Sequence, residues 1–128
     1  MGQQQLLLIV LGVIVVGIAV VVGINLFNAN ATNANRDGVI SDLNNLGAMA
    51  QQYYKKPTSM GGGGNEFTGW VIPTGLDSTA NGTYAPPTVT TTNVTIVGTG
   101  TEPGTIPANP VQASCVVTAT TIQVTVVN

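Results

Sequence analysis

The stretch LLLIVLGVIVVGIAVVVGI, residues 6–24, decides the fold of this chain. These nineteen residues are apolar or glycine, and the first charged side chain, Arg36, comes well after them. A helix of about 20 residues rises about 30 Å, which matches the hydrocarbon core of a bilayer. The run therefore predicts a helix that is buried in lipid or among other apolar helices.

Four kinds of segment contain such a run. A secretory signal peptide has a basic start and a shorter apolar stretch, whereas this run follows Met-Gly-Gln-Gln-Gln and is longer. A core helix of a soluble protein is rarely so long and so apolar. Two interpretations remain open: a single-pass membrane anchor, and a helix that begins as an anchor and later packs inside a filament.

Three glycines interrupt the run, at Gly12, Gly17 and Gly23. In apolar surroundings, glycines let helix backbones approach closely, which favours helix association. Glycine is also simply common in membrane helices. The spacing of five and six residues does not decide between an assembly role and this background.

A helical pattern continues beyond the run. The residues that recur at spacings of four and three are Val39, Leu43, Leu46, Ala50 and Tyr53. This stripe predicts an amphipathic helix that packs one side on a partner. Lys55 and Lys56 precede Pro57, as is typical of a helix C-terminus. The Asn-rich link at residues 25–35 contains no Pro or Gly, so one helix is expected from about Gln3 to Lys56, about 80 Å long.

The C-terminal half changes to a period of two. Strands are expected at 67–72, 88–97, 111–118 and 121–127, with a long Pro-containing loop at 98–110. Within the last two strands, the apolar positions that alternate with polar ones include Cys115, Val117, Ile122, Val124 and Val126. This alternation indicates a sheet with one buried face. Gly61–Gly64 is expected to be a flexible connection from helix to sheet.

The fold class expected is α+β: a long N-terminal helix, apolar in its first half and amphipathic in its second, packed on a small C-terminal antiparallel β-sheet. Residues 1–24 are the membrane or filament-core helix and residues 25–56 are its amphipathic continuation. Residues 57–128 form a Gly- and Thr-rich sheet domain.

The composition excludes several functions. Only 6% of residues are charged and the net charge is −2, so no basic surface for nucleic acid is expected. The chain has no His and a single Cys, Cys115, which on an alternating strand is a small core residue. We therefore expect no enzyme activity, no metal and no cofactor. The low charge favours a subunit that buries much of its surface in an assembly.

Three sites match the N-glycosylation acceptor pattern. They begin at Asn30, Asn81 and Asn93. The pattern arises often by chance in a chain rich in Asn and Thr, so it is a weak indication of modification.

Taken together, a short polar start, about twenty apolar residues, an amphipathic continuation and Thr/Val-rich strands resemble the type IV pilin family, including pseudopilins. The resemblance in sequence covers Met1–Gln5, the apolar run and the stripe, and the remainder matches in architecture. The residues it assigns to the self-assembling helix are Met1, Gln5, Leu6, Leu7, Leu8, Ile9, Val10, Leu11, Gly12, Val13, Ile14, Gly17, Ile18, Val21, Gly23, Ile24 and Phe27.

The resemblance implies a life cycle. In this family, prepilin peptidase removes a short basic leader after a Gly, and the new N-terminal amine is often methylated. Here the leader is expected to precede Met1; the alternative, with Met1 as the initiator, is cleavage after Gly2, which leaves Gln3 first. The helix waits in the inner membrane until the pilus assembly machinery draws it into a surface filament made of copies of the same chain. Here Gln5 stands where the family usually has Glu, which pairs with a neighbour's amine, and the family's Pro within the run is absent.

Overall fold

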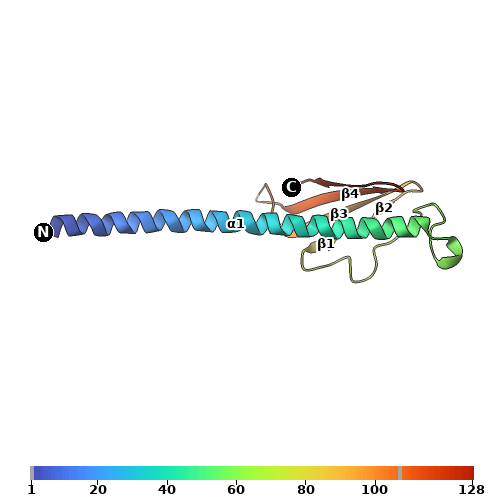
Figure 1. Cartoon of the computed structure of the whole chain (residues 1–128), viewed down its shortest axis with the longest axis horizontal. Helices are drawn as coiled ribbons and strands as arrows, with labels where there is room; N and C mark the ends of the chain where they lie inside the picture. The colour runs from blue at the N-terminus through green and yellow to red at the C-terminus, as the bar shows by residue number, and fades with distance from the viewer. Residues whose placement is uncertain (1, 107) are drawn as a thin grey trace. The chain divides into compact units, whose positions relative to one another are not determined.

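In the computed structural model, residues 2–106 and 108–128 are described. Figure 1 shows the long helix α1 and the strands in order along the chain. The elements are α1 (Gly2–Lys55), the short 3-10 helix η1 (Thr58–Met60), β1 (Gly82–Tyr84), β2 (Thr88–Val89), β3 (Asn93–Pro103), β4 (Pro110–Thr118) and β5 (Ile122–Val126). The expected α+β class, with one long N-terminal helix and a small antiparallel sheet, is confirmed.

The chain divides into two compact units that share α1. The N-terminal unit ends at Ala31, and the second unit, Thr32–Asn128, is called here the globular unit. The second half of α1 therefore belongs with the sheet. The Asn-rich link stays helical, as expected, because no Pro or Gly interrupts it and its Ala residues favour helix.

The sheet is antiparallel throughout. Its strand order is β1-β3-β4-β5, and β2 pairs with β3 as well. The β3–β4–β5 part is a meander in which Ile96 lies opposite Cys115, and Cys115 lies opposite Val124. The second half of α1 lies along one face of this sheet (Figure 1).

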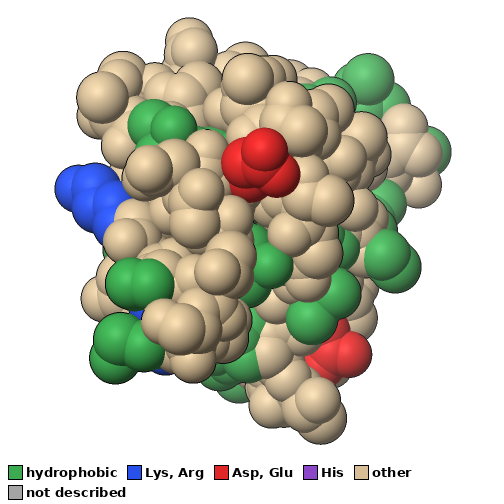
Figure 2. Space-filling model, turned by 90° about the vertical axis from the view of Figure 1, so that its right-hand side faces the viewer, with side chains coloured by type: hydrophobic (Ala, Val, Ile, Leu, Met, Phe, Trp, Pro, Cys, Tyr) green, Lys and Arg blue, Asp and Glu red, His purple; other side chains and the backbone are tan. Residues whose placement is uncertain are grey.

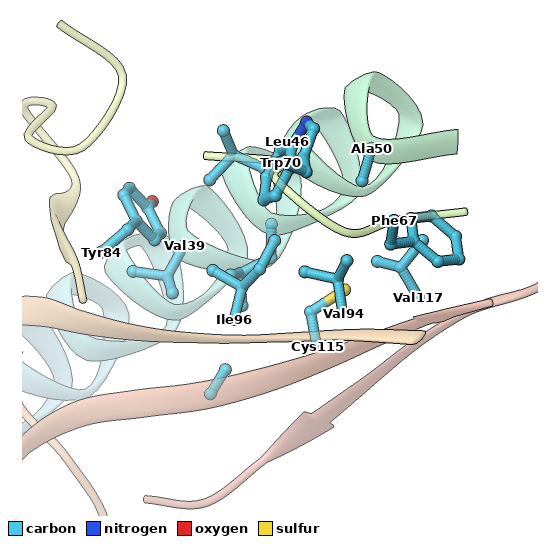
Figure 3. Packing of buried hydrophobic residues seen from close by; sticks show 12 residues of the cluster. Val39, Leu46, Ala50, Phe67, Trp70, Tyr84, Val94, Ile96, Cys115 and Val117 are labelled. Atoms are coloured by element: carbon cyan, nitrogen blue, oxygen red, sulfur yellow. The ribbon is translucent and has the colours of Figure 1, made fainter. Parts of the chain in front are cut away.

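The core fills the space between α1 and this face of the sheet (Figure 3). The stripe residues Val39, Leu43, Leu46 and Ala50 are buried, and Tyr53 is partly buried against the same cluster. From the sheet, Val94, Ile96, Cys115 and Val117 are fully buried, and Ile122 and Val124 pack at the margin. The helical and strand periodicities thus identified both sides of the apolar interface between α1 and the sheet, which is called here the seam.

Glycines let the two layers approach closely. A Cβ at Gly47 of α1 would lie 3.0 Å from Ile122 Cγ2 and 3.2 Å from Val117 Cγ2. A Cβ at Gly98 of β3 would lie 2.7 Å from the Tyr84 ring and 3.1 Å from Val39 Cγ1. Both are tight contacts, so glycine at these positions sets the distance between helix and sheet.

Val126 was expected in the core, and this prediction is wrong. Its side chain is 45% exposed, although it continues the alternation of Ile122 and Val124. β5 is an edge strand, and Val126 lies at its end, paired with Ala113. An alternating pattern identifies which face a residue is on, but it does not say how far the covering helix and loops extend.

The expected strand at 67–72 does not form. Gly69 has a positive φ of 89°, and the Trp70 N–H donates to the Phe67 carbonyl at 3.0 Å, so the segment turns instead. The turn still buries Phe67 and Trp70 in the core, where Phe67 packs on Tyr54 with ring centroids 4.7 Å apart. The apolar residues of this segment thus correctly indicated burial, but they did not indicate a strand.

The expected strand at 88–97 is instead a hairpin. β2 ends at Val89, and the Thr90 side chain accepts from the Asn93 N–H at 3.0 Å to close the turn. β3 then runs on to Pro103, through residues that were expected to be loop. It extends this far because the Asn35 side chain accepts from the N–H groups of Thr101 and Glu102, where the β3–β4 register breaks. β1 was not expected.

The glycines at 61–64 were expected to be a flexible connection, but they close the end of α1. The N–H groups of Gly63 and Asn65 donate to the carbonyls of Tyr53 and Tyr54, at 2.8 and 2.7 Å. Gly61 and Gly64 have positive φ, which glycine adopts without strain. The loop thus satisfies carbonyls that a helix end leaves unpaired.

Truncating the seam should destabilise the globular unit. Leu46→Ala removes a side chain that is 2% exposed, so we expect a loss of about 2–5 kcal/mol in the free energy of unfolding. The measurement is thermal unfolding of the full chain in detergent, followed by the fluorescence of buried Trp70. Asn45→Ala, on the exposed side of the same helix turn, is the matched control. Equal midpoints for both variants would contradict this packing.

Candidate functional site

The N-terminal unit presents apolar side chains on all sides. Every residue from Gly2 to Asn30 is exposed, and the large apolar side chains between Leu6 and Phe27 are 52–74% exposed. The most apolar 18-residue window of α1 has a mean hydropathy of 3.3, and none of it is buried. By length and composition, α1 is able to cross a membrane.

Apart from Met1, the residues assigned to the self-assembling helix lie on this segment. Gln5 is exposed on the first turns of α1, and its amide has no charge to pair. A Cβ added at Gly12, Gly17 or Gly23 would meet no atom within 4 Å. Nothing within the chain therefore requires glycine there. Met1 lies outside the described residues.

In the globular unit, the Asp42 carboxylate ties α1 to the segment that contains β1. Its Oδ2 accepts hydrogen bonds from Tyr84 OH at 2.6 Å, Thr79 Oγ1 at 2.8 Å and Asn81 Nδ2 at 3.1 Å. Gly38 lies one turn before Asp42, and a Cβ there would overlap the Asn81 side chain. The Asp42 carboxylate thus binds three side chains of the 79–84 segment, and the missing side chain of Gly38 leaves room for one of them, Asn81.

The network lowers the pKa of Asp42 and raises the pKa of Tyr84. Burial alone would raise the pKa of the Asp42 carboxyl, but the three donated hydrogen bonds outweigh it, and the pKa lies below the usual 3.8. Burial, together with the bond to the Asp42 charge, raises the pKa of the Tyr84 hydroxyl. Both shifts keep Asp42 ionised and Tyr84 protonated, which preserves the hydrogen bond between them.

Two asparagines have a similar positioning role. The Asn35 amide donates to the Asn81 carbonyl at 2.7 Å and to Thr101 Oγ1 at 3.2 Å. The Asn128 side chain accepts from the Ile106 N–H at 2.8 Å and donates to the Pro110 carbonyl at 2.9 Å. Both side chains are buried and replace backbone partners that the loops lack.

The sequence reasoning missed these polar groups, although one of them was recognisable. Asn35 lies four residues before Val39, so it continues the apolar stripe in phase and is buried for the same reason. Asp42 is next to Leu43 at the margin of the stripe. Nothing local in the sequence identifies Thr79, Asn81 and Tyr84 as its partners.

The three glycosylation acceptors differ in environment. Asn30 is exposed within α1. Asn81 is half-buried, and its amide nitrogen is engaged with Asp42. Asn93 begins β3, where its Oδ1 accepts from Thr90 Oγ1 at 3.1 Å. Glycosylation of each stays a prediction, and Asn30 is the acceptor whose side chain is most exposed to solvent.

Chemically reactive groups do not converge among the described residues. Cys115 is fully buried in β4, and burial raises its thiol pKa to about 11. No group of three or more potential metal ligands occurs within residues 2–106 and 108–128. Within the described residues, the feature that most needs a partner is the exposed apolar surface of the first half of α1.

No family model, curated protein or solved structure matches this chain.

The two halves of α1 have different surfaces. Its first half offers apolar surface around the full circumference, and its second half is one side of a packed core. Such a helix is able to insert into lipid or to pack among like helices, because both surroundings remove the same side chains from water.

The Asp42 network makes stability depend on pH. Because the folded-state pKa of Asp42 is depressed, its stabilisation is present above about pH 4 and is lost as the pH falls through the folded pKa. Asp42→Asn should cost about 1 kcal/mol at pH 7, since the group is only partly buried and solvent screens it. The difference from the parent should shrink as the pH falls from 7 to 2, because Asp42 takes up a proton in the folded state below its lowered pKa.

Unfolding midpoints at pH 7 and pH 2, measured by Trp70 fluorescence in detergent, check this prediction. Asp37→Asn, on the exposed side of α1, should change the free energy of unfolding at pH 7 by less than about 0.5 kcal/mol. A cost for Asp42→Asn that is the same at both pH values would show that the charge is not what stabilises the segment.

Proposed function

We propose that this chain is a structural subunit of a type IV pilus-like filament at the cell surface, and that it polymerises through its N-terminal helix. The observation that carries the proposal is the exposure of seventeen large apolar side chains between Leu6 and Phe27. Burying one such side chain contributes about 1.5–3 kcal/mol. Leaving all of them in water costs on the order of tens of kcal/mol, so this surface has to be covered.

Two surroundings cover it in turn. Before assembly, the helix lies in the cytoplasmic membrane, for which its length and apolar composition are sufficient. In the filament, copies of the same helix surround one another and form the core. The pilus assembly machinery and prepilin peptidase are the partners that the resemblance to pilins implies. Methylation of the processed N-terminal amine belongs to the same expectation.

The composition of the globular unit supports a polymer. Only 6% of the residues of the whole chain are charged, whereas about 25% are charged in typical soluble globular domains. The polar positions are filled by Thr, Asn and Gly. A subunit with neighbours on several sides has less surface to keep in water and needs fewer charges.

Electron microscopy of cell-surface material tests the proposal. We expect helical fibres that contain this chain, and a helical reconstruction in which residues 6–27 lie in the core. Cells that lack the chain are the control. If the chain stays in the membrane as a single-pass anchor under every growth condition, with no fibres, it displays its β domain for a partner instead and the filament proposal is wrong.

The glycines of the apolar run should matter only in the assembled state. A Gly12→Leu, Gly17→Leu double variant has room within the chain, because a Cβ at either position meets no atom within 4 Å. We expect the variant to accumulate in the membrane but to form no fibres, because bulky side chains hold neighbouring helices apart. Fibre yield and membrane level are measured together. Normal fibres from the double variant would show that Gly12 and Gly17 have no role in helix packing.

Gln5 should be less critical than the glutamate it replaces in typical pilins. An unpaired carboxylate in an apolar core costs several kcal/mol, whereas an amide costs less when it is imperfectly bonded. We expect Gln5→Leu to retain most of the fibre yield, because packing along residues 6–24 carries the contact. Gln5→Glu is measured beside it. Loss of fibres in Gln5→Leu together with full yield in Gln5→Glu would mean that position 5 docks a neighbouring amine.

A further inference from the structure

The two edges of the sheet are finished differently. On one edge, residues 77–79 cover β1, because the Tyr84 N–H donates to the Asp77 carbonyl and the Thr79 N–H donates to the Gly82 carbonyl, both at 2.8 Å. β2 lies on the same side of β3, has only two residues and follows two prolines. Short strands, prolines and covering segments protect an edge from pairing with another chain. β5 ends the strand order on the other edge, has five residues and contains no proline, and no described strand pairs with its outer side.

The outer side of β5 (dark red in Figure 1) presents backbone hydrogen-bonding groups. The Val127 N–H donates to the Gln112 carbonyl at 2.8 Å, so the backbone of position 127 faces β4. In an antiparallel pair, successive residues face their backbone groups alternately toward the partner strand and away from it. The N–H and C=O groups of Ile122, Val124 and Val126 therefore point away from β4. An added strand is able to accept and donate bonds at all three positions.

The side chains of β5 suit such pairing. Ile122 and Val124 are half-buried and Val126 is 45% exposed, all on the side of the sheet that faces α1, whereas Gln123 and Thr125 are exposed on the other side. β-branched residues favour strands. Residues 103–128 contain no charged side chain, and charges are sparse elsewhere too, as the view from the right-hand side of Figure 1 shows (Figure 2). No charge on β5 therefore repels an approaching strand.

The pattern of β5 is symmetric, which identifies the strand that fits it. About Val124, the sequence reads apolar, polar, apolar, polar, apolar in both directions. When two copies of β5 pair antiparallel about this residue, Ile122 lies opposite Val126 and Gln123 lies opposite Thr125. Apolar side chains then meet on the side that faces α1, and polar ones meet on the other side. The three positions with outward backbone groups become directly opposite pairs, and each pair exchanges two hydrogen bonds. The pairing also covers the exposed side chain of Val126.

We propose that β5 of one copy pairs antiparallel with β5 of a second copy and joins the two sheets into one. The contact is isologous, so it closes at two copies. Its two-fold axis is perpendicular to the sheet, and the second half of α1 therefore runs in opposite directions in the two copies. Copies whose helices run in the same direction, as in one fibre core, cannot make this contact with each other. The pairing does not depend on the proposed filament function, but in fibres it would join two that lie side by side, where many weak contacts add up.

Disulfide trapping of the full chain in detergent tests the pairing and its register. Gln123→Cys and Thr125→Cys are prepared as single variants and are oxidised separately and as a mixture. In the proposed register, position 123 of one copy lies opposite position 125 of the other, about 4.5 Å apart between Cα atoms, whereas the two positions 123 lie on a diagonal of about 7–8 Å, too far for a disulfide. Cys115 is 0% exposed and should not react.

We expect the mixture to give about tenfold more disulfide-linked dimer than either variant alone, because only the mixture brings the two thiols opposite each other. Equal yields from all three samples would overturn the register. No dimer from any sample would overturn the pairing of two copies and would leave the edge to a strand of another protein.

Substitutions at Val126 test whether the edge itself makes the contact. This side chain is 45% exposed, so both variants should keep the unfolding midpoint of the parent. When added to the two cysteine variants, Val126→Lys should reduce the trapped dimer about tenfold, because a lysine at an edge opposes strand addition. Val126→Thr, which is β-branched and uncharged, is the matched control and should retain the dimer. Equal dimer yields from Val126→Lys and Val126→Thr would overturn the role of this edge.

Fibres made by cells separate this contact from the filament function. We expect parent fibres to lie in bundles and Val126→Lys fibres to lie singly, with the same fibre yield. Parent fibres that stay single would overturn the contact between fibres and leave the filament function standing. A trapped dimer from a chain that makes no fibres would support the pairing and overturn the filament function. If the chain gives neither a trapped dimer nor fibres, both proposals are wrong.

Discussion

One helix has to satisfy two different surroundings, and the rest of the structure follows from this constraint. The first half of α1 is apolar on every side, so only lipid or other apolar helices are able to solvate it. The second half is apolar on one side and packs there on β3 and β4. The change occurs within continuous helix, where the Asn-rich link replaces Val and Ile with polar side chains.

The seam with the sheet combines apolar packing with a few exact polar contacts. Apolar packing alone tolerates sliding of a helix along a sheet, since a hydrophobic contact has no direction. Asn35 and Asp42 remove this freedom, because each meets several partners whose positions are fixed by the chain around them. Gly47 and Gly98 permit the close approach of helix and sheet, because a Cβ at either position would be crowded by the opposite side chains. The orientation of the seam is thus set by side chains that contribute little apolar area.

The extent to which sequence predicted this fold depends on the range of each interaction. The apolar run, the stripe from Val39 and the alternation in β4 are local patterns, and they gave the helix, its buried side and the core of the sheet correctly. The turn around Phe67 and the extension of β3 to Pro103 depend on distant partners. The sequence-based predictions for these two segments, a strand and a loop, were therefore wrong. For the same reason, the stripe identified residues of the seam, while the partners of Asp42 had no signature in the sequence. The exposed helix was predictable in full because no tertiary contact defines it.

The way α1 lies along the sheet has a mechanical consequence. The strands β3 and β4 run nearly along the helix (Figure 1). Asn35, Asp42 and Gln51, which are about two turns apart along α1, bond to the chain that packs against the helix. A force that pulls the helix along its axis therefore loads these bonds and the apolar seam in shear, all at once, instead of peeling them apart one after another. Under tension along α1, the globular unit would resist extraction of its helix as a whole and would yield abruptly rather than gradually.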